Sequence, residues 1–237
     1  MHPLADQVVL VTGATDGLGR GLAAHLAAQG ATVLVHGRDD ERGRATMQAI
    51  TQATPDARLQ WYRADLASLD EVRGLAAAVG ADHPRLHALV SNAGIGTNVP
   101  GGGVRQESAD GHELRFAVNY LAGYLLTREL LPNLLAAAPA RVVHVSSLGQ
   151  APIDFDDVML THSYSGVHAY CQSKLAQVLD TVRLAGELGD VGVTVNALHP
   201  ATYMPTKIVP TPTSTLEEGI EATARLVVDP ELDHTSG

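Results

Sequence analysis

Short apolar segments rich in β-branched residues alternate with amphipathic segments along most of the chain. Continuously apolar segments of this length are typical of strands in a parallel sheet that helices cover on both faces. Strict alternation of strands and helices predicts an α/β fold with a doubly wound parallel sheet of the Rossmann type. The six predicted strands lie within residues 8–12, 31–37, 58–66, 86–92, 141–147 and 191–200.

Helical periodicity fills most of the segments between these strands. The predicted helices span residues 18–30, 39–52, 68–79, 113–137 and 168–189. No linker, repeat or low-complexity tract divides the chain, so residues 1–237 are expected to form a single domain. Three irregular segments, at 95–111, 150–166 and 202–215, follow the carboxyl ends of strands, where ligands bind in this architecture.

Composition argues against several classes of function. The net charge of −10 leaves no basic surface for a nucleic acid, although a single nucleotide needs only a local site. No apolar run approaches the roughly 20 residues of a membrane span, and the first residues lack the basic region of a signal peptide. Cys171 is the only cysteine, which is typical of the reducing cytoplasm, and we interpret it as a small helix residue. The scattered histidines predict no metal site.

A glycine-rich turn, TGATDGLG, joins the first predicted strand to the first predicted helix. Gly13, Gly17 and Gly19 would let the backbone turn tightly and approach a pyrophosphate, which the free N–H groups of the helix could bind. The spacing is GxxxGxG and differs from the GxGxxG of other dinucleotide folds. The alternative interpretation is a tight strand–helix connection without a ligand.

Tyr170 and Lys174 stand four residues apart near the start of the helix predicted at 168–189. This spacing puts both side chains on one helix face. A nearby ammonium favours the phenolate, so Lys174 is expected to lower the pKa of Tyr170 from its usual value of about 10. By spacing alone, an unremarkable surface pair explains the pattern equally well.

Six motifs in the same order resemble the short-chain dehydrogenase/reductase family. They are TGATDGLG, SNAG (91–94), Asn119 in FAVNYLAGYLLT, Ser147 at the end of VVHVSS, YCQSK (170–174) and LHP (198–200). The segments SADGHELRFAVNYLAGYLLT, PIDFDDV and AYCQSKLAQVL resemble the retinol-dehydrogenase-like and protochlorophyllide-reductase-like branch. Ser147 and Tyr170 stand 23 positions apart, as in that branch, which implies a substrate flap around 150–166. A substrate loop is expected around 202–215.

The resemblance implies a role for each of four catalytic residues. Tyr170 would be the general acid in reduction and the base in oxidation. Ser147 would hydrogen-bond the substrate oxygen, and Lys174 would tune Tyr170 and hold the nicotinamide ribose. Asn119 would help to hold a water molecule in a proton relay from Lys174 to solvent.

The resemblance also implies which residues bind the cofactor. They are Gly13, Thr15, Asp16, Gly17, Leu18, Gly19, Arg38, Asp65, Leu66, Asn92, Ala93, Gly94, Tyr170, Lys174, Pro200, Thr202 and Thr206. Arg38 follows the second strand where an NAD-specific protein would carry an acid, so we favour NADP(H), with NAD possible. Asp16 stands where some NADP-using relatives carry a base.

Two departures from the family pattern concern the carboxyl-terminal part. Ala201 replaces the glycine that usually follows Pro200, and Thr202 and Thr206 compete as the carboxamide-binding threonine, of which we favour Thr206. The resemblance would place a last strand at HTSG, where the sequence reaches Gly237, so a seventh strand is left open.

The sequence therefore predicts an NADP(H)-dependent oxidoreductase that transfers a hydride between nicotinamide and a carbonyl or secondary alcohol of a fairly apolar small molecule. The alternatives are a non-catalytic dinucleotide-sensing regulatory protein and a cofactor-assisted epimerase or dehydratase. Asn119 and Tyr170 lie on helices that usually pair across a two-fold axis in this family, so a cytoplasmic homodimer or homotetramer is expected. No partner membrane or nucleic acid is expected.

Overall fold

A parallel six-stranded sheet organises the computed structural model, which describes residues 2–97, 101–205 and 211–237. Its strand order is β3-β2-β1-β4-β5-β6, and every neighbouring pair is parallel. The strands are β1 (Val8–Val11), β2 (Thr32–Gly37), β3 (Arg58–Arg63), β4 (Ala88–Ser91), β5 (Ala140–Val145) and β6 (Val193–Leu198). The predicted doubly wound α/β fold is confirmed.

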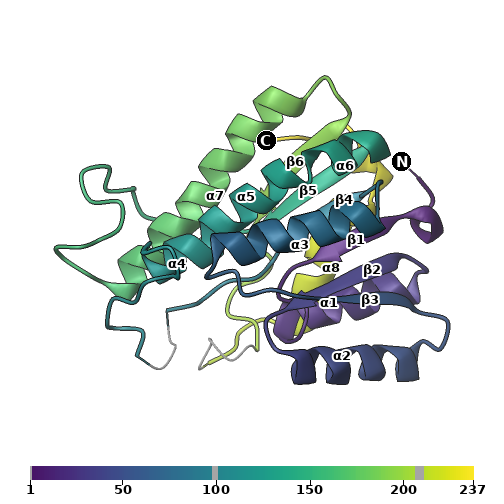
Figure 1. Ribbon diagram of the computed structural model, residues 1–237, viewed down its shortest axis with the longest axis horizontal. Helices are drawn as coiled ribbons and strands as arrows, with labels where there is room; N and C mark the ends of the chain where they lie inside the picture. The colour runs from purple at the N-terminus through teal and green to yellow at the C-terminus, as the bar shows by residue number, and fades with distance from the viewer. Residues whose placement is uncertain (1, 98–100, 206–210) are drawn as a thin grey trace.

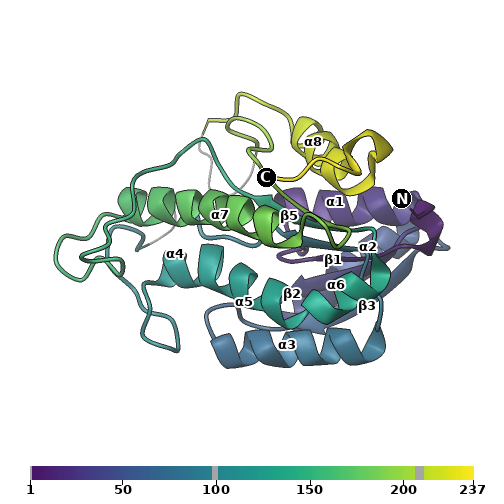
Figure 2. The same cartoon turned by 90° about the horizontal axis from the view of Figure 1, so that it is seen from above.

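Helices cover both faces of this sheet (Figures 1 and 2). One face packs against α1 (Gly17–Ala28), α2 (Asp40–Ala53) and α8 (Leu216–Val228). The other packs against α3 (Leu69–Asp82), α5 (Ala122–Glu129), α6 (Leu131–Ala137) and α7 (Gly166–Leu188), with the short α4 (Leu114–Phe116) beside them. In the described part of the chain, no helix is long and apolar enough to cross a membrane.

The two cores explain why the central strand β1 is apolar at every position. Val9 and Val11 of β1 belong to the core beneath α1 and α8, whereas Leu10 belongs to the core beneath α3, α5 and α7. Successive side chains point to opposite faces of a strand, so both faces of the sheet exclude water. Because helices cover both faces, a ligand can reach the sheet only at the ends of its strands, and the loops that follow the carboxyl ends lie together at one edge.

The long helical stretch predicted at 113–137 is confirmed over residues 114–137, with one interruption at Leu130. It consists of α4, a π-helical turn over Ala117–Leu121, α5 and α6. Asn119 lies in the π-helical turn, and such turns are frequent at functional sites. Leu130 separates α5 from α6, and Pro132 fits the first turn of α6 because its missing N–H is not needed there.

Helix α8 was not predicted, although the sequence carries its signal. Thr215 and Glu218 form a capping box at its start, and Ile220, Ala224 and Val227 are buried at helical spacing. The Pro- and Thr-rich segment before it, at 202–215, was predicted only as a substrate loop.

The residues that the resemblance associated with a seventh strand lie beside β6. The N–H of Gly237 donates to the carbonyl of Val195, and the Asn196 side chain donates to the carbonyl of Thr235. The described residues form no seventh strand in the sheet.

Candidate active site

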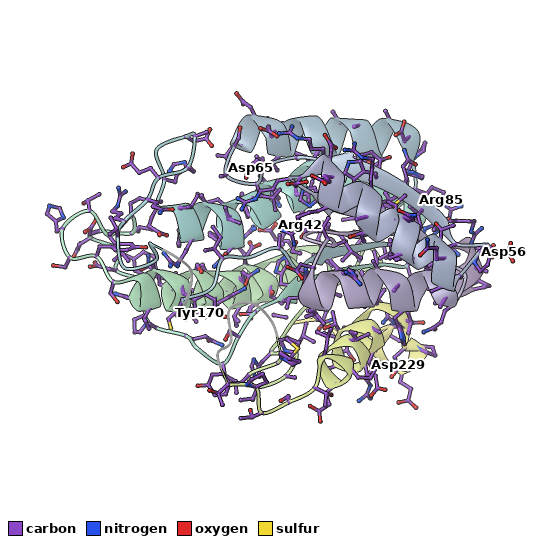
Figure 3. The ribbon with its side chains drawn as sticks, turned by 90° about the horizontal axis from the view of Figure 1, so that it is seen from below. Arg42, Asp56, Asp65, Arg85, Tyr170 and Asp229 are labelled. Atoms are coloured by element: carbon purple, nitrogen blue, oxygen red, sulfur yellow. The ribbon has the colours of Figure 1, made fainter. Side chains whose placement is uncertain are left out.

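A cavity of about 930 Å³ lies at the carboxyl ends of the strands. It spans β1 and β4, where the strand order reverses, which is the place at which open α/β sheets bind ligands. Arg42, Asp65 and Tyr170, labelled in Figure 3, all line it. Among the residues predicted for the site, the lining includes Gly13, Thr15, Asp16, Gly17, Leu18, Gly19, Arg38, Asp65, Leu66, Asn92, Ala93, Gly94, Ser147, Tyr170, Lys174, Pro200 and Thr202.

Two predicted residues are not in that lining. Asn119 is buried behind the cavity wall. Thr206 lies outside the described residues. Thr202 does line the cavity, together with Tyr203 and Met204 of the same loop.

The glycine turn packs too closely for side chains. A Cβ on Gly19 would stand 2.4 Å from the carbonyl oxygen of Gly13 and 2.4 Å from Nδ2 of Asn92. Gly13 has a φ of 64° and Gly17 a φ of 47°, values that L side chains rarely adopt. The glycines are therefore required by the turn itself, which brings the first N–H groups of α1 to the cavity.

Asn92 fastens the end of β4 to this turn. Its side-chain Nδ2 donates to the carbonyl of Thr12 at 2.8 Å, and its backbone N–H donates to Oγ1 of Thr12 at 3.0 Å. The N–H of Ala93 donates to the same hydroxyl oxygen. The SNAG motif thus holds the two central strands together at the cavity floor.

His36 supports the glycine turn from β2, a role that sequence analysis missed. Its Nδ1 accepts a hydrogen bond from the N–H of Gly13 at 3.2 Å, so its Nε2 donates to the carbonyl of Ala64, also at 3.2 Å. Burial lowers the pKa of His36 to about 4, so the ring is neutral near pH 7. A polar residue inside the apolar strand VLVHG was the available signal.

Two arginines line the end of the cavity beyond β2. Arg38 is exposed there, as expected, and Arg42 of α2 lies beside it in the lining. Nη2 of Arg42 donates to Oδ2 of Asp16 at 2.9 Å, and both side chains are half-exposed. Arg42 was not predicted, although it follows Arg38 by four residues.

Tyr170 and Ser147 meet at the opposite end of the cavity. Tyr170 lies on the first turn of α7, and Ser147 follows β5. Burial raises the pKa of Tyr170, while a hydrogen bond with the Ser147 side chain opposes that rise. The net direction is upward, so the phenol keeps its proton at neutral pH.

Lys174 lies beside Tyr170 and is buried, although it lines the cavity. Its Nζ is 5.7 Å from the centre of the Tyr170 ring and donates to the carbonyl of Val145 and to Oε1 of Gln177, both at 2.9 Å. Burial lowers the pKa of Lys174 to about 8. The expected lowering of the Tyr170 pKa by Lys174 is therefore not found. The Lys174 ammonium bonds to other acceptors, and burial raises the pKa of the phenol more than its neighbours lower it.

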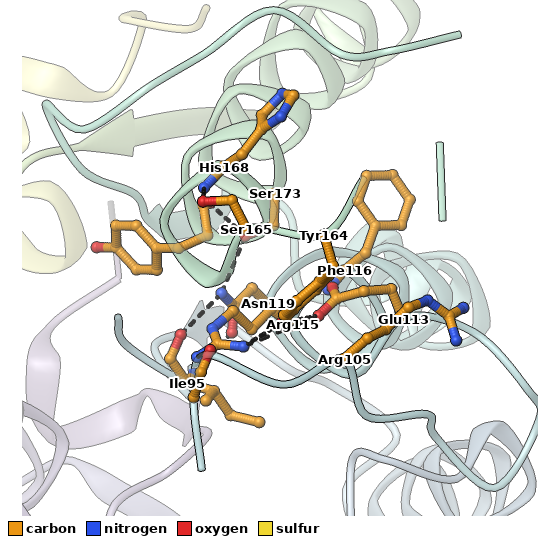
Figure 4. A network of polar contacts seen from close by, with 12 residues as sticks. Ile95, Arg105, Glu113, Arg115, Phe116, Asn119, Tyr164, Ser165, His168 and Ser173 are labelled. Atoms are coloured by element: carbon orange, nitrogen blue, oxygen red, sulfur yellow. Dashed lines mark hydrogen bonds and ion pairs between the residues drawn. The ribbon is translucent and has the colours of Figure 1, made fainter. Parts of the chain in front are cut away.

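Asn119 connects the π-helical turn to its surroundings. Its Oδ1 accepts from the N–H of Ile95 at 2.7 Å, and its Nδ2 donates to Oγ of Ser173 at 2.9 Å and to the carbonyl of Ile95 at 3.2 Å. These bonds join the loop after β4 to Ser173 of α7, as Figure 4 shows. Ser173 directly precedes Lys174 in the sequence.

A buried ion-pair network holds the segment predicted as a flap (Figure 4). Nη1 of Arg115 donates to the Tyr164 hydroxyl at 2.5 Å, and that hydroxyl donates to Oε1 of the fully buried Glu113 at 3.1 Å. Arg115 also donates to the carbonyls of Gly96 and Gly102. One arginine therefore ties the 150–166 segment to the loop that follows β4. The cavity lining passes from Gly149 to Tyr170 and does not include that segment.

The fold and this site define a Rossmann-type protein with a cavity at the switch point of its sheet, and comparison with known proteins identifies the family. The model of the family described as short chain dehydrogenase matches residues 7–215. The chain belongs to this family, in its retinol-dehydrogenase-like branch. It is 41% identical over 200 residues to retinol dehydrogenase 13 of Homo sapiens, covering 83% of this chain and 59% of that protein.

Other relatives and solved structures agree. Retinol dehydrogenase 12 of Homo sapiens is 39% identical over 199 residues, covering 83% of this chain and 61% of that protein. The chain thus spans about three fifths of the length of these curated relatives. A short chain dehydrogenase from Salmonella enterica has a TM-score of 0.78 at 27% identity, covering 100% of this chain and 96% of that one. A metagenomic short-chain oxidoreductase in complex with NADP has a TM-score of 0.72 at 28% identity, covering 93% and 90%.

Proposed function

We propose that the protein is an NADP(H)-dependent oxidoreductase that acts on a carbonyl or secondary alcohol of a fairly apolar small molecule. The observation that carries this proposal is one cavity that contains both the glycine turn of α1 and the Tyr170–Ser147 pair. A nucleotide held by the turn would lie along the cavity toward Tyr170, which brings cofactor and proton donor together.

The residues of the nucleotide end fit a dinucleotide. The N-terminus of α1 supplies a positive dipole end and N–H groups for a pyrophosphate, next to backbone kept bare by Gly13 and Gly17. Ala93 and Gly94 would lie along the nicotinamide ribose. The preference for NADP(H) rests on Arg38 and Arg42, whose guanidinium groups can pair with a 2′-phosphate. The NADP complex of the metagenomic relative agrees with that preference.

The chemical end has the groups for proton transfer. When bound, the nicotinamide supplies or accepts the hydride. Tyr170 is a phenol whose pKa burial raises further above neutral pH, so it holds a proton that it would donate to the carbonyl oxygen of a substrate. Ser147 would hydrogen-bond the same oxygen and stabilise the charge that develops on it. Lys174 has a third N–H beyond the two bonds it makes, and this donor would hold the ribose.

The walls of the cavity favour an apolar substrate. Its lining includes the apolar side chains of Ile95, Leu114, Val118, Leu148 and Met204. These come from separate loops and helices, so their combined shape would select the substrate. The 150–166 segment is proposed to cover the substrate from outside the lining.

The alternative function is a dinucleotide sensor that catalyses nothing. The full set of Asn119, Ser147, Tyr170 and Lys174 favours an enzyme over a sensor. A cofactor-assisted epimerase or dehydratase would use the same residues and is the third candidate.

The test is a fluorescence titration with NADPH and NADH, combined with activity measurements against a panel of apolar aldehydes and ketones. We expect tighter binding of NADPH and consumption of NADPH with at least one carbonyl compound. Binding without turnover of any compound would favour the sensor, and absence of binding by either nucleotide would contradict the proposal.

We propose further that the protein is a homodimer or homotetramer that pairs through α5 and α7. Leu179 and Val182 of α7 are 49% and 60% exposed, so these apolar side chains are available to a second copy of the chain. Sedimentation at micromolar concentration measures the mass, and a monomer would contradict this assembly.

A further inference from the structure

Among the described residues, a group of buried polar atoms behind Lys174 has no hydrogen-bond partner in the protein. The atoms are Oγ of Ser91, Nε2 of His144 and Oδ2 of Asp180. Buried polar atoms in native proteins are almost always paired with protein or with ordered water, so each of these three requires a partner.

The three side chains belong to adjoining elements on one face of the sheet. Ser91 of β4 and His144 of β5 are directly paired in the register of neighbouring strands, so their side chains point to the same face. Thr181 of α7 contacts the His144 ring through its hydroxyl. Asp180 directly precedes Thr181, and the carboxylate of Asp180 is near enough to act electrostatically on the His144 ring. Helix α5 covers Ser91 closely, since a Cβ on Gly123 would stand 3.2 Å from Oγ of Ser91.

Hydrogen bonding fixes the tautomer of His144. The Thr181 hydroxyl donates its one hydrogen to the carbonyl of Gln177 at 2.8 Å. Nδ1 of His144, 3.0 Å from the same oxygen, must therefore be the donor in that contact. Burial lowers the pKa of His144, so the ring is neutral and Nε2 carries a bare lone pair.

The donors and acceptors of the three atoms match those of one water molecule. Nε2 of His144 is an acceptor because the ring proton is on Nδ1. Oδ2 of Asp180 is also an acceptor, and the other carboxylate oxygen, Oδ1, accepts from Arg183 at 2.8 Å. Oγ of Ser91 can donate. A direct Ser91–His144 bond would leave Oδ2 of Asp180 unpaired, whereas a water molecule donates twice and accepts once.

We propose that Ser91, His144 and Asp180 bind one buried water molecule between the sheet and helices α5 and α7, and that this water site positions Lys174. The connection runs through hydrogen bonds from His144 to Thr181, from Thr181 to the carbonyl of Gln177, and from Lys174 to Oε1 of Gln177. The positioning role rests on the proposed function, because Lys174 matters only if the site is an active site. The binding of water does not depend on it.

The first test is a crystal structure of the full chain at a resolution that shows ordered water. We expect a water peak within about 3.2 Å of Oγ of Ser91, Nε2 of His144 and Oδ2 of Asp180. Rotated side chains that bond one another directly, with no water between them, would overturn the proposal.

The second test compares two small substitutions. Ser91→Ala removes one partner of the water, and we expect about a tenfold fall in the folding equilibrium constant. Thr194→Val is the matched control, because Oγ1 of Thr194 on β6 is also buried without a protein partner but pairs in register with Arg141, away from this site. We expect no loss of stability there. Equal behaviour of the two variants would contradict the water site, and if Ser91→Ala does not fold, the crystal structure decides.

The positioning role has its own readout. In the folded Ser91→Ala protein we expect kcat to fall several-fold with the KM for the carbonyl substrate unchanged, whereas Thr194→Val keeps both constants. An unchanged kcat with the water peak present would reduce the site to a structural one and overturn the positioning role. If the wild-type protein has the water peak but no activity, the proposed function fails and the water site stands.

Discussion

The two ends of the cavity are built differently. At the glycine turn, Thr12, His36 and Asn92 hydrogen-bond the backbone, and they come from β2 and from the ends of its neighbours β1 and β4. At the other end, Tyr170 and Ser147 stand among loops that come from distant parts of the sequence and are joined through side chains such as Arg115. The first end is a fixed receptor, whereas the second depends on several segments packing together. Changes at the first should therefore act on stability and nucleotide binding, and changes at the second on turnover.

The largest expected effect is at the chemical end. Tyr170→Phe keeps the ring but removes the proton donor, and we expect kcat to fall by about 10³. The dissociation constant for NADPH should change less than about threefold, which corresponds to less than about 1 kcal/mol of binding free energy. Steady-state kinetics and fluorescence titration of the same preparation measure both. A kcat within tenfold of the wild type would remove Tyr170 from the mechanism.

A Cβ in the glycine turn should act on stability. Gly19→Ala would press against the Gly13 carbonyl and Asn92, which cannot both move, so we expect a loss of about 3 kcal/mol in the free energy of unfolding. Gly74→Ala is the matched control, because Gly74 lies in α3 with nothing within 4 Å of the added Cβ. That change should stabilise the protein by about 0.5 kcal/mol. Urea denaturation tests the pair, and equal stabilities would contradict the tight turn.

Acid should weaken the glycine end through His36. Its pKa lies near 6.5 in the unfolded chain and about 4 in the folded protein, so the unfolded chain takes up a proton that the folded protein excludes. The stabilisation is complete above pH 6.5 and falls by about 3 kcal/mol as the pH drops toward 4.

His36→Gln should flatten that part of the pH dependence. Urea midpoints of the wild type and the variant at several pH values between 7 and 4 measure the difference, in which the contributions of other groups cancel. Parallel pH profiles would show that His36 is not buried as a neutral ring.

The smallest expected effect concerns the choice of nucleotide. Arg42→Ala should weaken NADPH binding about tenfold and leave NADH binding unchanged, because the guanidinium is proposed to pair with the 2′-phosphate. Titration with both nucleotides checks this, with Arg73→Ala on the exposed side of α3 as a control that should alter neither. An equal loss of affinity for NADPH and NADH would contradict a contact with the 2′-phosphate. It would mean that Arg42 supports the glycine turn through its bond to Asp16.

Features set by local sequence patterns could be predicted, whereas features set by contacts between distant elements could not. The strands, the sheet class and the residues of the glycine turn follow from local patterns, and the structure confirms the strands and the fold. His36 and Arg42 were missed because their roles depend on which residues of other elements they face. The π-helical turn within the predicted 113–137 helix was missed because helical periodicity does not distinguish it from an α-helix. Asn119 in that turn bonds to Ile95 and Ser173, which are distant in the sequence.

The electrostatics of the chemical end were the least predictable feature. Helical spacing correctly places Lys174 near Tyr170, but it does not reveal that the ammonium is bound by Val145 and Gln177. Nor does it reveal how far the phenol is buried, which decides the direction of its pKa. Such quantities depend on the whole packed environment and not on the spacing of two residues.

The most direct test of the central claim is a transfer experiment with NADPH that carries deuterium at the reactive C4 position. We predict that wild-type protein incubated with an accepted ketone yields an alcohol with one deuterium on the former carbonyl carbon, as measured by mass spectrometry, and that Tyr170→Phe yields almost none. An alcohol without deuterium, or no product from any carbonyl compound despite bound NADPH, would contradict the claim that this cavity brings a nicotinamide and Tyr170 together on one substrate.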